Sequence, residues 1–140
     1  MTNFTDFLTK SEENHGKELC MSLDLETTRS DGVIVVSCCG RVVFGEETTG
    51  LCKTVRELLP ESPQIVLNFR AVKNVDSGGL GALVGLVTSA RSLGGDVKLC
   101  DLSSHVQSIF QITRLRTVID VFTSQQEAIS AFQRRAAAIA

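Results

Sequence analysis

Short apolar runs alternate with helical patterns along most of this 140-residue sequence. Runs of roughly four to eight apolar or alternating residues are typical of strands, whereas apolar residues spaced three and four apart indicate helices. Strands are predicted at residues 21–26, 33–36, 65–69, 97–100 and 118–122. Helices are predicted at residues 46–59, 78–93, 104–113 and from 124 onwards.

The order of these elements, β-β-α-β-α-β-α-β-α, predicts a single-domain α/β fold. Strands that alternate with helices are joined by right-handed crossovers and lie parallel in the sheet. The turn residues Ser30, Asp31 and Gly32 join the first two strands as an antiparallel hairpin. We therefore expect a mainly parallel mixed sheet of about five strands, the first antiparallel, with about four helices. The strand at residues 33–36 is apolar at successive positions, which predicts cover on both of its faces.

Length and charge limit the classes of protein to consider. The chain is long enough for one core, and we expect a domain over residues 21–135 after an N-terminal extension over residues 1–20. The net charge is −2 and Trp and Tyr are absent, whereas a nucleic-acid surface needs a basic patch and usually stacking rings. No run approaches the roughly 20 apolar residues of a membrane span, and residues 1–10 lack the pattern of a signal peptide. A cytoplasmic protein is expected.

The cysteines and histidines form no pattern that binds a metal or catalyses a reaction. The cysteines are odd in number and lack CxxC or Cys/His spacing, which argues against a disulfide framework and a zinc site. We expect reduced thiols at all of them, which are Cys20, Cys38, Cys39, Cys52 and Cys100. His15 and His105 have no evident acid to orient them, and we interpret both as solvated residues. The sequence therefore predicts no cofactor, no metal site and no catalytic residue, and the protein is not expected to be an enzyme.

The run Asp76-Ser77-Gly78-Gly79-Leu80-Gly81 lies where an apolar stretch ends and a helical pattern begins. Helix N-termini present unpaired backbone N–H groups and a partial positive charge, which favour a carboxylate or a phosphate. Ser77 can therefore cap the helix or carry a phosphate there.

The helix that follows carries a face of small residues opposite its leucine and valine stripe. Glycines inside a helix each cost roughly 1 kcal/mol relative to alanine, which favours a close approach by another group. That approach can be packing by a neighbouring element or docking by a partner, and plain solvent exposure is a third interpretation. Under the docking interpretation, the partner-binding residues are Asp76, Ser77, Gly78, Gly79, Gly81, Gly85 and Ser89.

A nucleotide site is the main competing interpretation of the same glycines. Gly79, Gly81 and Gly85 open a helix, and Asp101 lies about 20 residues further on at the end of the next strand, as in a dinucleotide fingerprint. The glycines do not follow the strand directly, however, and the chain is too short for the second half of a dinucleotide fold. A P-loop is excluded because the sequence contains no Gly-Lys-Ser or Gly-Lys-Thr.

Residues 21–132 resemble a STAS domain, and within that family the bacterial anti-sigma factor antagonists. The most specific part of the resemblance is the apolar run at residues 65–69, followed by a short loop and the Asp76-Ser77 pair at the start of a helix. The glycine pair after this helix also fits.

The resemblance implies a regulatory switch. In such antagonists the serine that directly follows the aspartate, here Ser77, is phosphorylated by a partner that is both a serine kinase and an anti-sigma factor. The unphosphorylated antagonist binds this partner and frees the sigma factor, the phosphorylated form does not bind, and a phosphatase restores it. Phosphate adds about −1.5 to −2 charges beside Asp76, which spoils a docking surface without unfolding the domain.

Two positions depart from the pattern of the phosphorylated members. Val43 stands three residues after Gly40, where many of them carry an acidic residue, and Gly78 replaces the usual second hydroxyl. These departures leave an alternative open, a STAS module without phosphorylation that scaffolds or senses a ligand. Its partner would be a transporter, a chemoreceptor or a lipid-transport component. The sequence identifies neither the partner nor the oligomeric state.

Overall fold

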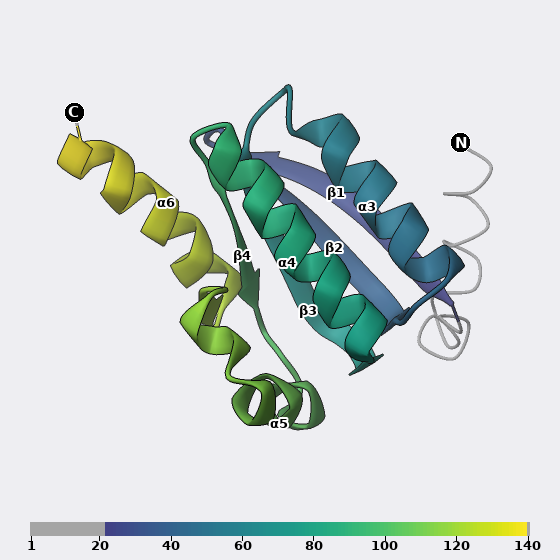
Figure 1. The fold of residues 1–140 in the computed structure, drawn as a ribbon. Helices are drawn as coiled ribbons and strands as arrows, with labels where there is room; N and C mark the ends of the chain where they lie inside the picture. The colour runs from purple at the N-terminus through teal and green to yellow at the C-terminus, as the bar shows by residue number, and fades with distance from the viewer. Residues whose placement is uncertain (1–21, 140) are drawn as a thin grey trace, which may run out of the picture.

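The computed structural model describes residues 22–139 and consists of one sheet flanked by helices (Figure 1). The strands are β1 (Leu23–Ser30), β2 (Val33–Val42), β3 (Gln64–Val75), β4 (Asp96–Cys100) and β5 (Val121–Phe122). The helices are α3 (Glu46–Leu58), α4 (Ser77–Ser92), α5 (Ser104–Thr113) and α6 (Gln125–Ile139), with a short 3₁₀ helix η1 (Leu115–Thr117).

The strands lie in the order β1-β2-β3-β4-β5. β1 pairs antiparallel with β2, and the other neighbours pair in parallel. The predicted α/β fold, its element order and its antiparallel first strand are confirmed. The expected extension over residues 1–20 lies outside the described residues.

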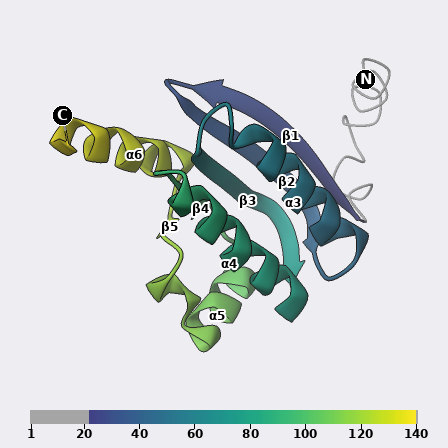
Figure 2. The same cartoon turned by 45° about the horizontal axis from the view of Figure 1, so that its top comes forward.

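Two apolar clusters lie on opposite faces of the sheet. Figure 2 shows α3 and α4 side by side over one of these faces. Ile34 and Val36 of β2 share the larger cluster with buried residues of α3, α4 and α5. Val33 and Val35 belong to the other cluster, which α6 covers. The successive apolar residues of β2 therefore face two separate layers of helices, as the sequence predicts. None of the helices in residues 22–139 is both long enough and apolar enough to cross a bilayer.

β2 and β3 run further than their apolar patterns predict. The predicted third strand ends at residue 69, whereas β3 continues to Val75 and pairs with the last residues of β2. Register shifts after Ser37 and after Gly40 disturb the alternation along this pair, and Lys73 interrupts the apolar run. Val72 and Val75 are nevertheless buried. The longer β3 carries the chain directly to the start of α4.

The last strand is shorter than predicted. The run at residues 118–122 predicts a strand, but β5 pairs with β4 only at Val121 and Phe122. Arg114 adopts a left-handed backbone, with φ 62°, that ends α5, and η1 then carries the chain to Val118. Val118 is consequently 38% exposed, whereas Ile119 is buried.

Among the cysteines that the structure describes, the prediction of reduced thiols is wrong for Cys39. Cys38, Cys52 and Cys100 are free thiols, but Cys39 is disulfide-bonded. Adjacent strand residues point to opposite faces. Cys38 is therefore buried in the larger cluster, whereas Cys39 is half-buried on the other face of the sheet. Burial raises the pKa of the Cys38 and Cys100 thiols, which keeps both protonated.

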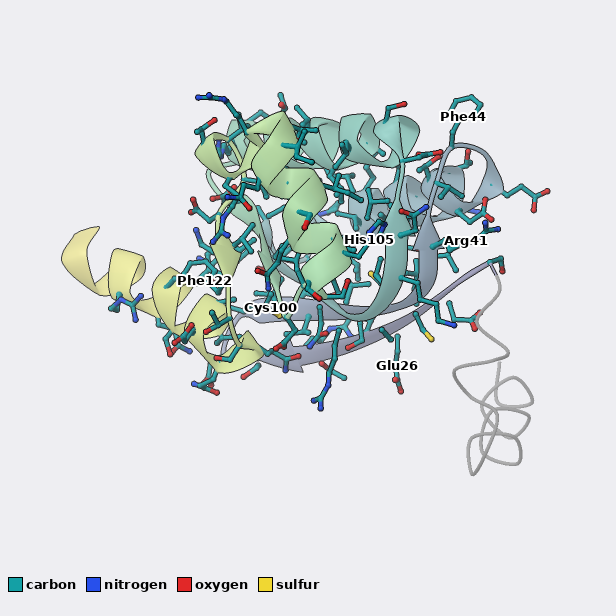
Figure 3. The ribbon with its side chains drawn as sticks, turned by 90° about the horizontal axis from the view of Figure 1, so that it is seen from below. Glu26, Arg41, Phe44, Cys100, His105 and Phe122 are labelled. Atoms are coloured by element: carbon teal, nitrogen blue, oxygen red, sulfur yellow. The ribbon has the colours of Figure 1, made fainter. Side chains whose placement is uncertain are left out.

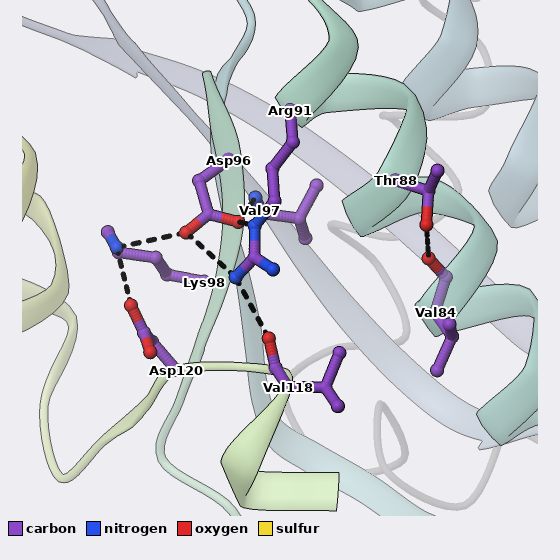
Figure 4. A network of polar contacts seen from close by, with 8 residues as sticks. All are labelled: Val84, Thr88, Arg91, Asp96, Val97, Lys98, Val118 and Asp120. Carbon is purple, nitrogen blue, oxygen red and sulfur yellow. Dashed lines mark hydrogen bonds and ion pairs between the residues drawn. The ribbon is translucent and has the colours of Figure 1, made fainter. Parts of the chain in front are cut away.

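A buried lysine, which the sequence analysis did not single out, lies in the middle of β4 (Figure 4). Lys98 is only 5% exposed, and its Nζ lies 3.2 Å from Oδ2 of Asp96 and 2.8 Å from Oδ2 of Asp120. The ammonium also lies over the rings of Phe122 and Phe132, at 5.8 and 4.8 Å from their centroids. Lys98 thus links β4 to β5 and α6.

An arginine extends this charged network to α4 (Figure 4). Nε of Arg91 donates to Oδ1 of Asp96 at 3.0 Å, and Nη2 donates to the carbonyl of Val118 at 2.8 Å. The Asp96 carboxylate is therefore shared between two cations, each from a different element. The network joins the end of α4 to the strand that follows it and to the turn before β5.

Candidate functional site

α4 begins where β3 ends, and Asp76 caps it. Oδ1 of Asp76 accepts a hydrogen bond from the backbone N–H of Gly79 at 2.8 Å. Both carboxylate oxygens also lie 3.1 Å from the backbone nitrogen of Phe44, which donates to them. The sequence leaves Ser77 as a candidate cap, but the structure gives that role to Asp76 and makes Ser77 the first residue of the helix. The side chain of an N-cap residue accepts a hydrogen bond from the backbone N–H two or three residues further along the chain, as Asp76 does from Gly79.

Ser77 is exposed at the first position of α4. In the described part of the chain its hydroxyl has no hydrogen-bond partner. The hydroxyl lies at the end of the helix where the backbone N–H groups and the partial positive charge favour an added anion. Ser77 is thus open to chemical modification, and the capping of α4 does not depend on it.

Hydrogen bonds hold the Asp76 carboxylate in its charged form. The backbone N–H of Gly79, and after it that of Phe44, lower the pKa of Asp76 below its ordinary value of 3.8. The carboxylate beside Ser77 therefore stays charged to a lower pH than an ordinary aspartate does.

Asp76→Asn should reduce the acid sensitivity of folding. Because the pKa of Asp76 is lower in the folded chain than in the unfolded chain, its stabilising contribution is complete above the unfolded value, near 3.8. That contribution is lost as the pH falls through the folded pKa. Asn also caps helices well, so the substitution isolates the charge. Urea denaturation should show the wild-type free energy of unfolding falling more steeply than that of Asp76→Asn below about pH 5. Parallel curves would contradict the assignment.

Two glycines at the start of α4 are required by close packing. A Cβ at position 79 would overlap the carbonyl oxygen of Val42, at the end of β2. A Cβ at position 78 would lie 2.5 Å from the Cβ of Phe44 and 3.1 Å from its Cα. The sequence analysis counts both among the partner-binding residues. Gly79 is buried, however, whereas Gly78 is half-buried beside Phe44.

The rest of the small-residue face of α4 is open. Ser77 and Gly81 are exposed, and Gly85 and Ser89 are half-buried. A Cβ at Gly81 or at Gly85 would meet no atom of the described chain within 4 Å. Intramolecular packing therefore does not account for these two glycines, and the exposed or partner-docking interpretations remain.

A groove runs between α3 and α4. Its volume is about 410 Å³, and it is lined by Thr48, Thr49, Cys52, Lys53, Arg56 and Ala82. Lys53 and Arg56 form no ion pair with any residue that the structure describes. Because the other lining residues are uncharged, the groove is positively charged.

The residues of the proposed dinucleotide fingerprint do not meet. Asp101 lines a separate cavity of about 330 Å³ near the ends of β4 and β5, and the lining of that cavity includes none of the three glycines. Gly79 instead packs on β2, and β3 lies between β2 and β4 in the sheet. The structure therefore does not bring the glycine run and Asp101 to one cavity, as the fingerprint requires.

The described histidine has the surroundings of a solvated residue. His105 is exposed on α5, and its Nε2 lies 3.0 Å from Oδ1 of Asn74, an amide oxygen that cannot act as an orienting acid. Residues 22–139 hold no cluster of His, Cys, Asp or Glu side chains that could bind a metal. His15 lies outside the described residues.

The structure adds Phe44, which the sequence analysis missed. It lies in the loop between β2 and α3, is 80% exposed, and projects away from the body of the protein (Figure 3). A lone aromatic residue in a loop has no periodicity to mark it. The available signal is Gly78, because only a residue without a side chain leaves room for Phe44 at that point.

Comparison with known proteins gives consistent matches. The profile of the STAS domain matches residues 24–128. The anti-sigma-B factor antagonist of Bacillus subtilis (strain 168) is 26% identical over 102 residues, which are 72% of this chain and 92% of that protein. The crystal structure of an anti-sigma factor antagonist from Mycobacterium paratuberculosis has a TM-score of 0.70 at 20% identity, covering 80% of this chain and 95% of that one.

A third similar protein, SpoIIAA, has been solved in two chemical states. Its unphosphorylated form has a TM-score of 0.59 at 17% identity, covering 80% of this chain and 98% of that one. The phosphorylated form from Bacillus has a TM-score of 0.59 at 19% identity, covering 79% and 98%. The fold of this chain is thus similar to that of a protein that exists with and without a phosphate.

Proposed function

The chain belongs to the STAS domain family, and we propose that it is an anti-sigma factor antagonist whose binding to a serine-kinase anti-sigma factor ends when Ser77 is phosphorylated. The observation that carries this proposal is the exposed Ser77 hydroxyl, without a partner among the described residues, at the first position of α4. The relative in Bacillus subtilis that is named an anti-sigma-B factor antagonist supports it. So does the likeness to SpoIIAA, which has a phosphorylated form.

In the proposed reaction this chain is the substrate. Ser77 Oγ attacks the γ-phosphorus of ATP bound to the kinase, an O–P bond forms, the bond to ADP breaks, and the hydroxyl proton passes to a base of the kinase. Phosphoryl transfer depends chiefly on positioning and on the cations of the kinase site, so the chain itself needs no catalytic residue. Its own contribution is a rigid helix start that presents the hydroxyl.

The phosphate acts through charge. It adds about −1.5 to −2 charges beside the Asp76 carboxylate, which the backbone already keeps ionised. The partial positive charge at the N-terminal end of a helix stabilises such an anion by only about 0.3 to 2 kcal/mol. The folded domain tolerates an exposed phosphate because water still solvates it. A docked partner would have to bury the phosphate, and binding would be lost.

Incubation with ATP and the serine-kinase anti-sigma factor of the same organism should add one phosphate to the wild-type protein, located at Ser77 by mass spectrometry. The Ser77→Ala variant should remain unmodified. Ser108→Ala is the matched control, because it removes an exposed serine hydroxyl from α5, outside the expected partner-binding residues, and it should be modified like the wild type. Phosphate on another residue, or none on the wild type, would contradict the proposal. Binding without phosphorylation would instead favour the scaffolding alternative.

A further inference from the structure

Phe44 is an unusual surface residue, because it is a large apolar side chain that is exposed on a loop whose backbone is fixed by hydrogen bonds. It is 80% exposed, although aromatic side chains of this size usually gain free energy by leaving water. Its backbone N–H donates to both oxygens of Asp76, so the residue that caps α4 also fixes the loop that carries Phe44. The backbone that carries the ring is thus held beside the start of α4.

Gly78 of α4 leaves the space that Phe44 occupies. A side chain at position 78 would meet Phe44 at both its Cβ and its Cα. Gly78 is one of the two departures from the pattern of phosphorylated STAS domains, which usually carry a hydroxyl there. The departure therefore has a structural reason in this chain, which is the placement of an aromatic ring next to Ser77.

The cationic groove continues this surface along the two helices. Thr48, which lines the groove, donates its hydroxyl to the carbonyl of Gly45, the residue after Phe44. Lys53 and Arg56 lie further along α3, and in the described chain neither has a carboxylate partner. Two cations without a carboxylate partner in the described chain, in a groove that begins near the loop of an exposed aromatic residue, match a partner of negative charge.

We propose that Phe44 and the groove between α3 and α4 form a specificity surface that takes an acidic segment of the kinase partner, with Phe44 inserted in an apolar pocket of that partner. This inference rests on the proposed function and adds the chemistry by which the partner is chosen. Aromatic residues are enriched at the centre of protein interfaces, whereas rim charges steer association. Phosphate on Ser77 at the head of the groove would repel the same acidic segment.

Truncation of Phe44 tests the apolar part of this surface. Phe44→Ala should weaken the dissociation constant for the purified kinase partner roughly tenfold or more, as truncation of a central aromatic anchor does. Ile112→Ala is the matched control, because Ile112 is 81% exposed on α5 and belongs to neither the groove nor the start of α4. It should bind like the wild type. Equal thermal unfolding of the two variants would show that folding is not the cause.

Charge reversal tests the groove. The double variant Lys53→Glu with Arg56→Glu should associate about tenfold more slowly at low salt, and its association rate should depend less on salt than that of the wild type. Arg116→Glu, in η1, is the control and should leave the rate unchanged. If the wild type binds the kinase but the Phe44 and groove variants bind equally well, the specificity surface is refuted while the proposed function stands. If the wild type does not bind, the proposed function fails and the inference fails with it.

Discussion

Protein carrying phosphate on Ser77 should bind its kinase partner about 30-fold or more weakly than the unphosphorylated protein. A buried charge without a partner costs about 2 to 5 kcal/mol at an interface, and each 1.4 kcal/mol is a factor of ten in affinity. The expected loss is large because Ser77 lies between Asp76, whose carboxylate stays ionised, and the open face of α4 that ends in half-buried Ser89. Isothermal titration calorimetry of both forms measures the ratio.

Three comparisons make this result specific to charge. Ser77→Ala should bind like the unphosphorylated wild type, because it removes a hydroxyl without adding charge. Ser77→Asp should show a smaller loss than the phosphoprotein, since it adds one negative charge instead of nearly two. All forms should unfold at similar temperatures, because Ser77 does not cap α4. Equal affinities of the phosphorylated and unphosphorylated proteins would refute the electrostatic mechanism.

Lys98→Met should lower the free energy of unfolding by about 3 kcal/mol. Removing one member of a buried ion pair typically costs 3 to 5 kcal/mol because the remaining charge is left without its partner. The lower end applies here, since Asp96 keeps its contact with Arg91 and Asp120 is 51% exposed at its side chain. The loss of the ammonium above Phe132 adds to the cost. Urea denaturation at neutral pH measures the change.

The double variant Lys98→Met with Asp96→Asn is the control for this interpretation. It removes the lysine and the more buried of its two carboxylate partners, so its stability should exceed that of Lys98→Met alone if the cost arises from a buried carboxylate that has lost one of its two cations. A loss below about 1 kcal/mol for Lys98→Met would show that the ion pair contributes little to stability. So would additivity, in which the double variant loses the sum of the free energies lost by Lys98→Met and by Asp96→Asn measured separately.

The fold could be predicted from the sequence because its signals are repeated and local. The successive apolar residues of β2 correctly indicated two covered faces, since Ile34 and Val35 lie in different clusters. The ends of strands could not be predicted where the ladder is irregular. Shifts of register beside Gly40 and the polar Lys73 hid the second half of β3, and a left-handed residue at Arg114 moved the start of β5.

The start of α4 could be located from the sequence, but its internal roles could not be assigned. Asp76 and Ser77 are both good capping residues, and only the distance to the N–H of Gly79 decides between them. The burial of Gly79, which the sequence analysis counts among the partner-binding residues, could not be predicted, because it depends on Val42 at the end of another element. The placement of Phe44 could not be predicted for the same reason, because it depends on a hydrogen bond to Asp76, which lies 32 residues further along the sequence.

Release of a sigma factor from its complex with the kinase partner tests the proposed antagonist role most directly. We expect the unphosphorylated protein to release the sigma factor in proportion to the amount added, as followed by transcription from a sigma-dependent promoter in a purified system. Protein fully phosphorylated at Ser77 should release almost none at the same concentration. No release by the unphosphorylated protein at saturating concentration, or equal release by both forms, would contradict the proposed function.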